Sequence, residues 1–234
     1  MSNYHIKHLE EYFQVYRKSI RNPESFWDEV AEEHFVWRKK WDKVLDWDFS
    51  KPEIKWFEGA KLNITENCID RHLHIRGDKT AILFEPNDPK EEAQHITYKE
   101  LHEKVCKFAN VLKDKGIKKG DMVVIYLPMI PELAVSVLAC ARIGAVHSVV
   151  FAGFSSTALA TRINDCGAKM VLTSDGSFRG SKTIDLKGIV DEALTQCDSV
   201  ENVLVAKRTQ TDVTMEEGRD HWLEPLLENA YANY

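Results

Sequence analysis

The chain has 234 residues, 44% of them hydrophobic, and its 31 basic and 37 acidic residues give a net charge of -6. This composition predicts a globular protein with a core, and the negative charge argues against a general nucleic-acid-binding surface. The sequence contains no apolar run of the roughly 18 residues that span a membrane, and its N-terminus lacks the apolar part of a signal peptide, so we expect a cytoplasmic protein.

The cysteines give no sign of a metal site or of a disulfide framework. There are five of them, an odd number, widely spaced and without a zinc-binding pattern. Most lie among apolar residues of helical period, which predicts small core side chains in a reducing compartment. They are Cys68, Cys106, Cys140, Cys166 and Cys197.

Residues 1–62 predict a helical extension rich in tryptophan. The segment from residue 4 to residue 20 predicts a helix, because its apolar side chains recur at steps of three and four, as on one helical face. Five of the six tryptophans lie between residues 27 and 56, and three basic residues stand between two of them. Stacking of nucleic-acid bases on these rings is one interpretation. We favour another, in which the aromatic side chains fasten the extension onto the body of the protein.

The next segment leads into an α/β domain. Asn63 and Glu66 are spaced as a capping pair, which predicts a helix from there through Leu73. Residues 80–96 predict two antiparallel strands joined by a charged surface loop. Thr97 and Glu100 then predict a capping box at the start of an amphipathic helix.

The centre of the chain alternates strands with helices. Apolar runs of strand length are separated by helical runs of about 10 to 15 residues, a spacing typical of right-handed βαβ units. We therefore predict an α/β fold with a doubly wound, mostly parallel sheet flanked by helices. The predicted strands cover residues 122–127, 147–151, 169–173 and 200–205, and the predicted helices cover residues 131–143, 155–167 and 189–194, with a short one near 222–228.

Ligands of such sheets bind beyond the carboxyl ends of the strands. Three loops are therefore candidates for a site: 127–131, 151–156 and 174–182. In the second of them, Gly153 stands between a strand and a helix, where a ligand can approach the backbone and the helix N-terminus favours anions. This glycine could equally serve only the tight turn.

The loop 175–183 has the sequence DGSFRGSKT. It is the segment of the chain whose residue types best suit ligand binding, with two glycines, two cations and three hydroxyl groups. It partly matches a phosphate-binding Walker A pattern that begins at Gly176, but Ser181 stands where the pattern has its second glycine. We prefer another interpretation, in which the side chains of Arg179 and Lys182 bind one phosphate. Such a site does not require the backbone to approach the phosphate as closely as a Walker A loop does. A solvated basic turn without a ligand is the remaining alternative.

No other catalytic pattern stands out. The sequence contains no GxSxG elbow, no HExxH zinc motif and no evident pair of carboxylates. His72, His74 and His147 have no evident carboxylate or cysteine partner, which predicts structural roles. We assign no catalytic residue and no metal ligand to this chain.

Longer stretches of the sequence resemble one family, the acetyl-CoA synthetases, within the acyl-adenylate-forming enzymes. The resemblance covers essentially the whole chain, and the tryptophan-rich extension fits the acetyl and propionyl members. The chain therefore resembles the N-terminal part of such an enzyme. The similar stretches are residues 56–73 (WFEGAKLNITENCIDRHL), 98–120, 126–155 (YLPMIPELAVSVLACARIGAVHSVVFAGFS) and 178–187 (FRGSKTIDLK).

The resemblance implies an ATP-dependent acetate–CoA ligase that works in two half-reactions. With Mg²⁺ present, the carboxylate attacks the α-phosphate of ATP, which releases pyrophosphate and leaves an acyl adenylate. The thiol of CoA then displaces AMP. The implied partners are small molecules, namely acetate, ATP and CoA, with no covalently bound cofactor, no nucleic acid and no membrane. A propionyl-CoA or other short-chain acyl-CoA synthetase is an alternative.

The resemblance also implies a CoA site. The matching residues are Phe151, Ala152 and Gly153 against the CoA adenosine, and Arg179, Gly180, Ser181 and Lys182 around its phosphates. Lysine at position 182 departs from the arginine that the family pattern has there. It keeps the charge but loses the bidentate fork, which implies weaker or differently oriented CoA binding.

The family's Ser/Thr/Gly-rich phosphate loop, its YxxTE motif, its ribose-binding aspartate and its C-terminal catalytic lysine match nothing in this sequence. We therefore predict an N-terminal fragment of a longer enzyme, inactive by itself, with an extension in residues 1–62 and a truncated AMP-binding domain in residues 63–234. A natural partial protein, a non-catalytic CoA-binding module and a degenerate P-loop protein are the alternatives. An exposed edge strand would favour self-association of the fragment.

Overall fold

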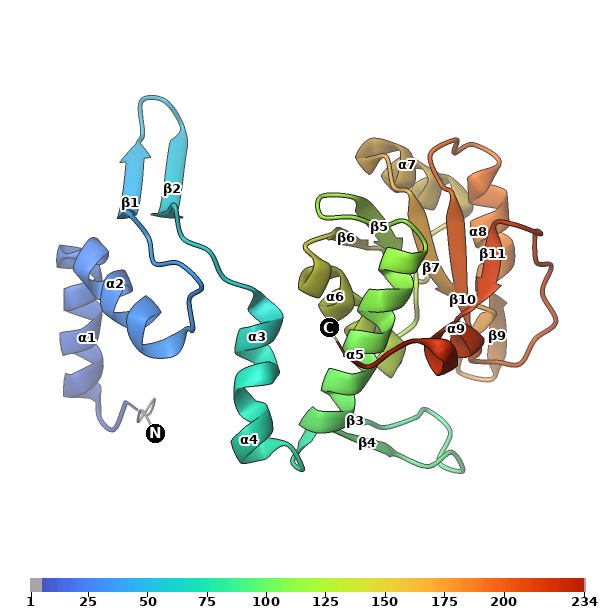
Figure 1. The fold of residues 1–234 in the computed structure, drawn as a ribbon, viewed down its shortest axis with the longest axis horizontal. Coiled ribbons are helices and arrows are strands. Elements are labelled where there is room, and N and C mark those ends of the chain that lie inside the picture. The colour runs from blue at the N-terminus through green and yellow to red at the C-terminus, as the bar shows by residue number, and fades with distance from the viewer. Residues whose placement is uncertain (1–5, 234) are drawn as a thin grey trace. The chain divides into compact units, whose positions relative to one another are not determined.

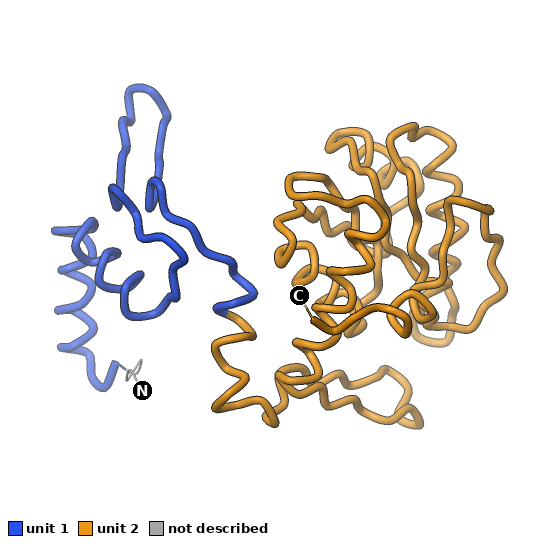
Figure 2. The backbone as a smooth tube through the Cα atoms, in the orientation of Figure 1, with its two compact units in different colours: residues 1–67 blue, residues 68–234 orange. Residues whose placement is uncertain are grey.

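A computed structural model of the protein describes residues 6–233 and divides the chain into two compact units, residues 1–67 and residues 68–234 (Figure 2). We call them unit 1 and unit 2. Unit 1 holds two helices and a hairpin, and unit 2 holds a parallel sheet between helices (Figure 1).

Unit 1 begins with the two predicted helices. They are α1 (Leu9–Arg21) and α2 (Pro23–His34). At the end of the first helix the backbone N–H of Asn22 donates to the Lys18 carbonyl, and the side chain of Asn22 caps the second helix by accepting from the Ser25 amide. Pro23 occupies the first turn of the second helix, where its missing N–H costs nothing. The sequence predicted a helix that starts at residue 4, and residues 4 and 5 lie outside the described part of the chain.

The predicted helical extension is incomplete, because an antiparallel hairpin that the sequence analysis did not predict follows the helices. Its strands are β1 (Lys43–Asp48) and β2 (Glu53–Glu58), and α3 (Ile64–Cys68) comes next. The tryptophans pack on neighbouring aromatic rings within the unit, with the ring centres of Trp37 and Trp41 5.1 Å apart. Their indole N–H groups donate to the Ala31 carbonyl and to Asp28. That they fasten the extension onto the body of the protein stays a prediction.

The single helix predicted from residue 63 to residue 73 is broken near Ile69. A 3₁₀ turn (Asp70–His72) and α4 (Leu73–Arg76) follow the break. Ile69 is buried in the core, and both carboxylate oxygens of Asp70 accept from Arg142, at 2.9 and 2.7 Å. These tertiary contacts override the helical pattern that the sequence shows.

A second hairpin and a long helix lead to the sheet. The hairpin consists of β3 (Thr80–Phe84) and β4 (Gln94–Thr97), which pair antiparallel as predicted. The helix is α5 (Tyr98–Asp114), and its capping box is confirmed: the Thr97 hydroxyl accepts from the Glu100 amide, while the Glu100 carboxylate accepts from the Thr97 amide.

The described strands of the central sheet are all parallel and run in the order β11-β10-β7-β5-β6. Four of them lie where the apolar runs predicted, within two residues at each end. The strands are β5 (Met122–Ile125), β6 (Val146–Val149), β7 (Met170–Ser174), β10 (Asn202–Ala206) and β11 (Asp220–Trp222). The prediction missed β11, which has only three residues.

Helices cover both faces of the sheet, which confirms the doubly wound fold. One hydrophobic cluster contains buried residues of α5, α6 and α9 and the other those of α7 and α8, while successive residues of β5, β7 and β10 alternate between the two clusters. These helices are α6 (Pro131–Ile143), α7 (Ser156–Cys166), α8 (Leu186–Leu194) and α9 (Leu223–Asn229). The predicted bounds of α6 are those observed.

The predicted core role holds for two cysteines and fails for one. Cys106 and Cys140 are buried, whereas Cys68 is exposed. Burial raises the pKa of the Cys140 thiol to about 12, so this sulfur stays protonated at neutral pH.

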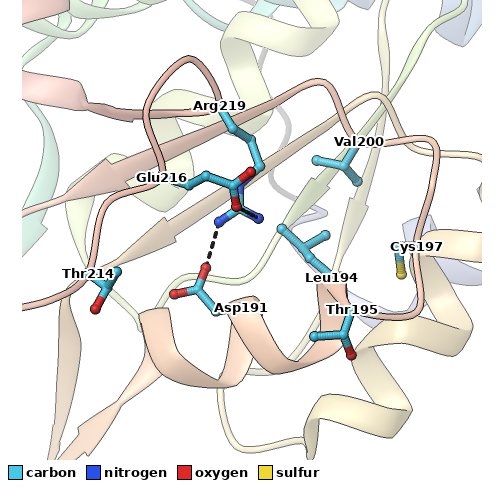
Figure 3. A pocket seen from close by; sticks show the side chains of 8 residues that line it. All are labelled: Asp191, Leu194, Thr195, Cys197, Val200, Thr214, Glu216 and Arg219. Atoms are coloured by element: carbon cyan, nitrogen blue, oxygen red, sulfur yellow. Dashed lines mark hydrogen bonds and ion pairs between the residues drawn. The ribbon is translucent and has the colours of Figure 1, made fainter.

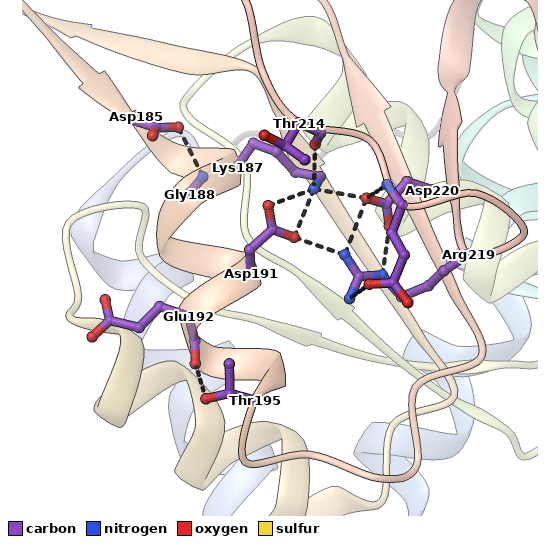
Figure 4. Close-up of polar contacts among 10 residues, drawn as sticks. Asp185, Lys187, Gly188, Asp191, Glu192, Thr195, Thr214, Arg219 and Asp220 are labelled. Atoms are coloured by element: carbon purple, nitrogen blue, oxygen red, sulfur yellow. Dashed lines mark hydrogen bonds and ion pairs between the residues drawn. The ribbon is translucent and has the colours of Figure 1, made fainter.

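A buried network of charges holds α8 to β11 (Figure 4). The Lys187 side chain is 1% exposed, and its ammonium lies 2.7 Å from both Asp191 and Asp220 and donates to the Thr214 carbonyl at 2.9 Å. Arg219 bridges the same two carboxylates from the other side. Because every one of these charges has an opposite partner, the network tolerates burial.

Removal of Lys187 is expected to destabilise the protein strongly. Lys187→Ala leaves Asp220, whose side chain is 0% exposed, with Arg219 as its remaining cation, and breaking a buried pair from one side costs about 3–5 kcal/mol. Urea unfolding followed by circular dichroism measures the change in the free energy of unfolding. In the matched control Lys107→Ala, the exposed pair with Glu103 on α5 is lost, at a cost below about 1 kcal/mol. Equal costs for the two variants would show that the network is not stabilising.

The same network predicts a loss of stability in acid. Burial by itself would raise the pKa of Asp220, but hydrogen bonds from Arg219 and Lys187 outweigh it and hold the pKa below its ordinary value. The unfolded chain therefore binds this proton more readily, and the free energy of unfolding falls as the pH drops below about 4. In Asp220→Asn the unfolding free energy should be lower at pH 7 and should depend less on pH between about 5 and 2. An unchanged slope would contradict the assignment.

Candidate functional site

A cavity of about 660 Å³ lies beyond the carboxyl ends of the sheet strands. The loops that follow β5, β6 and β7 all contribute to it, which confirms that the three loops singled out in the sequence meet at one place. The segment after β10 and the end of β3 complete the lining. The lining residues include Phe84, Leu127, Pro128, Met129, Phe151, Ala152, Gly153, Phe178, Arg179 and Arg208.

A buried tyrosine forms a hydrogen bond to the backbone of the loop that follows β6. Tyr126 is fully buried, and its hydroxyl donates to the Phe154 carbonyl at 2.7 Å. Phe151 stands in the loop with 71% of its surface exposed. A β-carbon at Gly153 would come within 2.5 Å of the Phe151 ring, so any other residue there would displace this aromatic side chain. The loop thus presents an exposed ring and bare backbone to the cavity.

The segment after β7 forms a hairpin where the sequence predicted a loop. Its strands are β8 (Gly176–Arg179) and β9 (Lys182–Asp185), with Arg179 opposite Lys182 and Gly180 in the turn at a φ of 60°. A P-loop passes directly from its lysine into a helix. Here Lys182 begins a strand and α8 starts only at Leu186. The Walker A alternative is therefore wrong for this segment.

Asp175 fixes the base of this hairpin. It is fully buried, and its Oδ1 accepts from the amides of Gly176, Arg208 and Thr209 at 2.7, 2.8 and 3.0 Å. Gly176 is also crowded, since a β-carbon there would lie 2.5 Å from the Thr209 hydroxyl and 2.9 Å from the Ile184 carbonyl. The carboxylate thereby ties the first residue of the hairpin to the segment that follows β10.

The structure brings together four of the seven residues predicted to bind CoA. Phe151, Ala152, Gly153 and Arg179 line the cavity. The remaining three, Gly180, Ser181 and Lys182, lie exposed at the tip of the hairpin and are not part of the lining. Within residues 6–233, neither Arg179 nor Lys182 forms an ion pair, so both charges are available to an anion.

The sequence analysis missed Arg208 and Glu91. The Arg208 guanidinium donates to both carboxylate oxygens of Glu91, at 2.6 and 2.9 Å, and lies 5.1 Å from the centre of the Phe178 ring. Arg208 follows the carboxyl end of β10, and this position could have identified it in the sequence as a candidate site residue. Glu91 stood in what was interpreted as a charged surface loop, and nothing in the sequence connects two positions 117 residues apart.

A second cavity, of about 670 Å³, lies beside α8 (Figure 3). Its charged residues include Asp191, Glu216 and Arg219, and Arg219 pairs with both carboxylates at 2.7 Å. Asp191 and Arg219 belong to the network described above, and Glu216 joins it from an exposed position through its pair with Arg219. Each of these three charged side chains of the lining therefore already has a partner of opposite charge.

The described helices include none that is long and apolar enough to cross a membrane. The first cavity lies at the carboxyl edge of the parallel sheet of an α/β domain, and Arg179 and Arg208 are part of its lining. The family of AMP-binding enzymes matches residues 69–230, and the acetyl-coenzyme A synthetase N-terminus matches residues 12–68. The chain belongs to the AMP-binding enzyme family.

Individual relatives agree with this assignment. The chain is 51% identical over 222 residues to an acetyl-coenzyme A synthetase of Alkalilimnicola ehrlichii, covering 95% of this chain and 34% of the relative. It is 54% identical over 224 residues to one of Magnetococcus marinus, covering 96% and 35%. An acetoacetyl-CoA synthetase structure from Streptomyces lividans superposes with a TM-score of 0.81 at 28% identity, covering 92% of this chain and 32% of that one. The chain thus spans about a third of the length of these relatives.

Tyr126→Phe is expected to loosen the loop that carries Phe151 without removing any apolar surface. The variant loses the hydrogen bond to the Phe154 carbonyl and leaves that oxygen to water, at a cost of about 1 kcal/mol. Amide hydrogen exchange should therefore increase in residues 150–155, and the melting temperature should fall by a few degrees. Phe108→Leu, which changes the other core cluster, serves as the control, because it should lower stability without a specific effect on this loop.

Proposed function

We propose that this chain forms the N-terminal part of an ATP-dependent acetate–CoA ligase, which makes acetyl-CoA through an acetyl adenylate and releases AMP and pyrophosphate. The observation that carries the proposal is the first cavity, where the loop 151–153 and Arg179 come together. The names of the relatives and the match to an acetyl-coenzyme A synthetase N-terminus support the same reaction.

CoA is the substrate that this part of the enzyme would hold. Arg179 and Lys182 stand on facing strands of one hairpin, and neither has an acidic partner among the described residues, which suits a ligand with several phosphates. The exposed Phe151 ring and the bare backbone at Gly153 suit the adenosine of the same ligand. We assign CoA binding to Phe151, Ala152, Gly153, Arg179, Gly180, Ser181 and Lys182. Lys182 would act as a point charge rather than as a bidentate fork.

The other parts of the reaction would come from segments that the longer relatives have and this chain does not span. Among the residues described here, no group of three or more histidine, cysteine or acidic side chains is placed to hold a metal ion. We therefore propose that ATP, Mg²⁺ and acetate bind outside this chain and that the chain alone is inactive. In this proposal residues 1–62 are the extension, residues 63–234 begin the AMP-binding domain, and the enzyme works in the cytoplasm on small molecules.

We further propose that the chain associates with itself when isolated. Strand β6 pairs with β5 alone in the described sheet, and Val146 and Val149 on it are 46% and 50% exposed. An apolar edge strand of this kind is a template for pairing with another chain. Light scattering should show dimers or larger species, and a monodisperse monomer would contradict this part of the proposal.

Calorimetric titration of the chain with CoA and with dephospho-CoA tests the proposed site. Arg179→Ala is expected to weaken CoA binding by about tenfold or more, because a hydrogen bond to a charged group contributes roughly 1.5–3 kcal/mol. Dephospho-CoA should bind more weakly than CoA and should be less affected by the substitution. Lys104→Ala, which removes an exposed charge on α5, is the matched control. Equal affinities for the two ligands would contradict the proposal that the hairpin binds the 3′-phosphate of CoA.

A further inference from the structure

The β3–β4 loop reaches the candidate site through one ion pair. Glu91 accepts two hydrogen bonds from the Arg208 guanidinium, at 2.6 and 2.9 Å. The loop that carries Glu91 is itself ordered, since the Asp88 side chain accepts from the Lys90 amide and the Asp88 carbonyl accepts from the Glu91 amide. The two charged side chains are 33% and 17% exposed, so the pair is partly shielded from water. Such bidentate pairs fix both geometry and distance.

Arg208 in turn touches the hairpin that carries the predicted phosphate-binding cations. Its guanidinium lies 5.1 Å from the centre of the Phe178 ring and 5.8 Å from that of Phe84, within the range of cation–π attraction. Its backbone amide shares the Asp175 carboxylate with Gly176, the first residue of β8. Arg208 is therefore linked to the hairpin twice, indirectly at its base through Asp175 and directly at Phe178, the residue beside Arg179.

The cations at the cavity and on its hairpin have two different roles. Glu91 neutralises Arg208, while in the described part of the chain Arg179 and Lys182 have no acidic partner. An incoming phosphate thus meets the two hairpin cations, and Arg208 stays engaged with Glu91 and the aromatic rings. Arg208 thus has the role of positioning the hairpin, while Arg179 and Lys182 have the role of binding the phosphate.

We propose that Glu91 and Arg208 are positioning residues that hold the β8–β9 hairpin, and with it Arg179 and Lys182, in the geometry that selects a nucleotide bearing a 3′-phosphate. The inference rests on the proposed CoA site but adds two residues to it. Neither touches the phosphate. Their effect is carried by the Phe178 ring and by the orientation of the hairpin.

Hydrogen–deuterium exchange tests the positioning step without any ligand. Glu91→Gln keeps the shape of the side chain and removes its charge, and Arg208→Lys keeps the charge and removes the fork and the flat face. Each is expected to raise the exchange rate of the β8 and β9 amides about three- to tenfold, the effect of losing one shielded charged contact. Glu103→Gln, which breaks an exposed pair on α5, should change nothing in the hairpin. Unchanged exchange in Glu91→Gln would overturn the proposal.

Titration with two nucleotides tests the consequence for selectivity. Adenosine 3′,5′-bisphosphate carries the 3′-phosphate of CoA, and adenosine 5′-monophosphate lacks it. In Glu91→Gln the ratio of the two affinities should fall about fivefold, in the same direction as in Arg179→Ala, for a change of about 1 kcal/mol. A residue with a purely structural role would lower the melting temperature and leave this ratio unchanged, and that result would overturn the proposal.

The two proposals can fail separately. If the unsubstituted chain binds neither nucleotide, the proposed CoA site is contradicted, while the exchange experiment still decides whether Glu91 and Arg208 hold the hairpin. If the chain binds the bisphosphate and Arg179→Ala weakens it, but Glu91→Gln alters neither exchange nor the affinity ratio, the CoA site stands and the positioning role is wrong.

Discussion

Complete burial of β7 is the constraint on which the rest of unit 2 depends. The strand lies between β5 and β10, and all of its residues are buried. Met170 and Leu172 enter one hydrophobic cluster and Val171 the other, so a single strand connects the two layers of helices. Each such side chain contributes about 1.5–3 kcal/mol when it leaves water. A sheet built around this strand is covered on both faces, and its loops are left as the places where a ligand is reached.

Polar residues at the carboxyl end of β7 fix the register of the strand. Thr173, Ser174 and Asp175 are buried, and the Asp175 carboxylate is satisfied by three backbone amides at the edge of the sheet. A slip along the strand would carry this carboxylate among apolar side chains and leave those amides without their acceptor, which is costly for buried groups. The same carboxylate that fixes the register therefore also fixes where the hairpin leaves the sheet.

The parts of the fold that were predictable from the sequence are those specified by neighbouring residues. The helix Pro131–Ile143 has proline at its start and Gly144 at its end with a φ of 75°, so its bounds could be read directly. The β8–β9 hairpin could not, because the residues Gly176–Arg179 and Lys182–Asp185 lack an apolar alternation and resemble a turn. Its order comes from Asp175 and Arg208, which act across the sheet edge.

The same distinction applies to the candidate site: features formed by neighbouring residues were predictable from the sequence, and contacts between distant segments were not. The exposed cations of the hairpin were visible in the sequence because two charges and two glycines stand close together. The ion pair of Arg208 with Glu91 and the buried position of Lys187 between Asp191 and Asp220 were not visible, because each joins segments brought together only by folding.

The buried cations Lys187 and Arg142 in unit 2 are each accompanied by a carboxylate, from Asp220 and from Asp70 respectively. Burial without a partner would cost several kcal/mol per ion, which explains why such groups occur in pairs. Arg179 and Lys182 differ because they are exposed to water, and in the described part of the chain they have no acidic partner. On a chain whose net charge is -6, two such cations at one sheet edge form a local basic region, which suits the polyanionic ligand proposed above. The contrast between paired interior cations and exposed edge cations therefore supports the proposal that the ligand binds at this edge of the sheet.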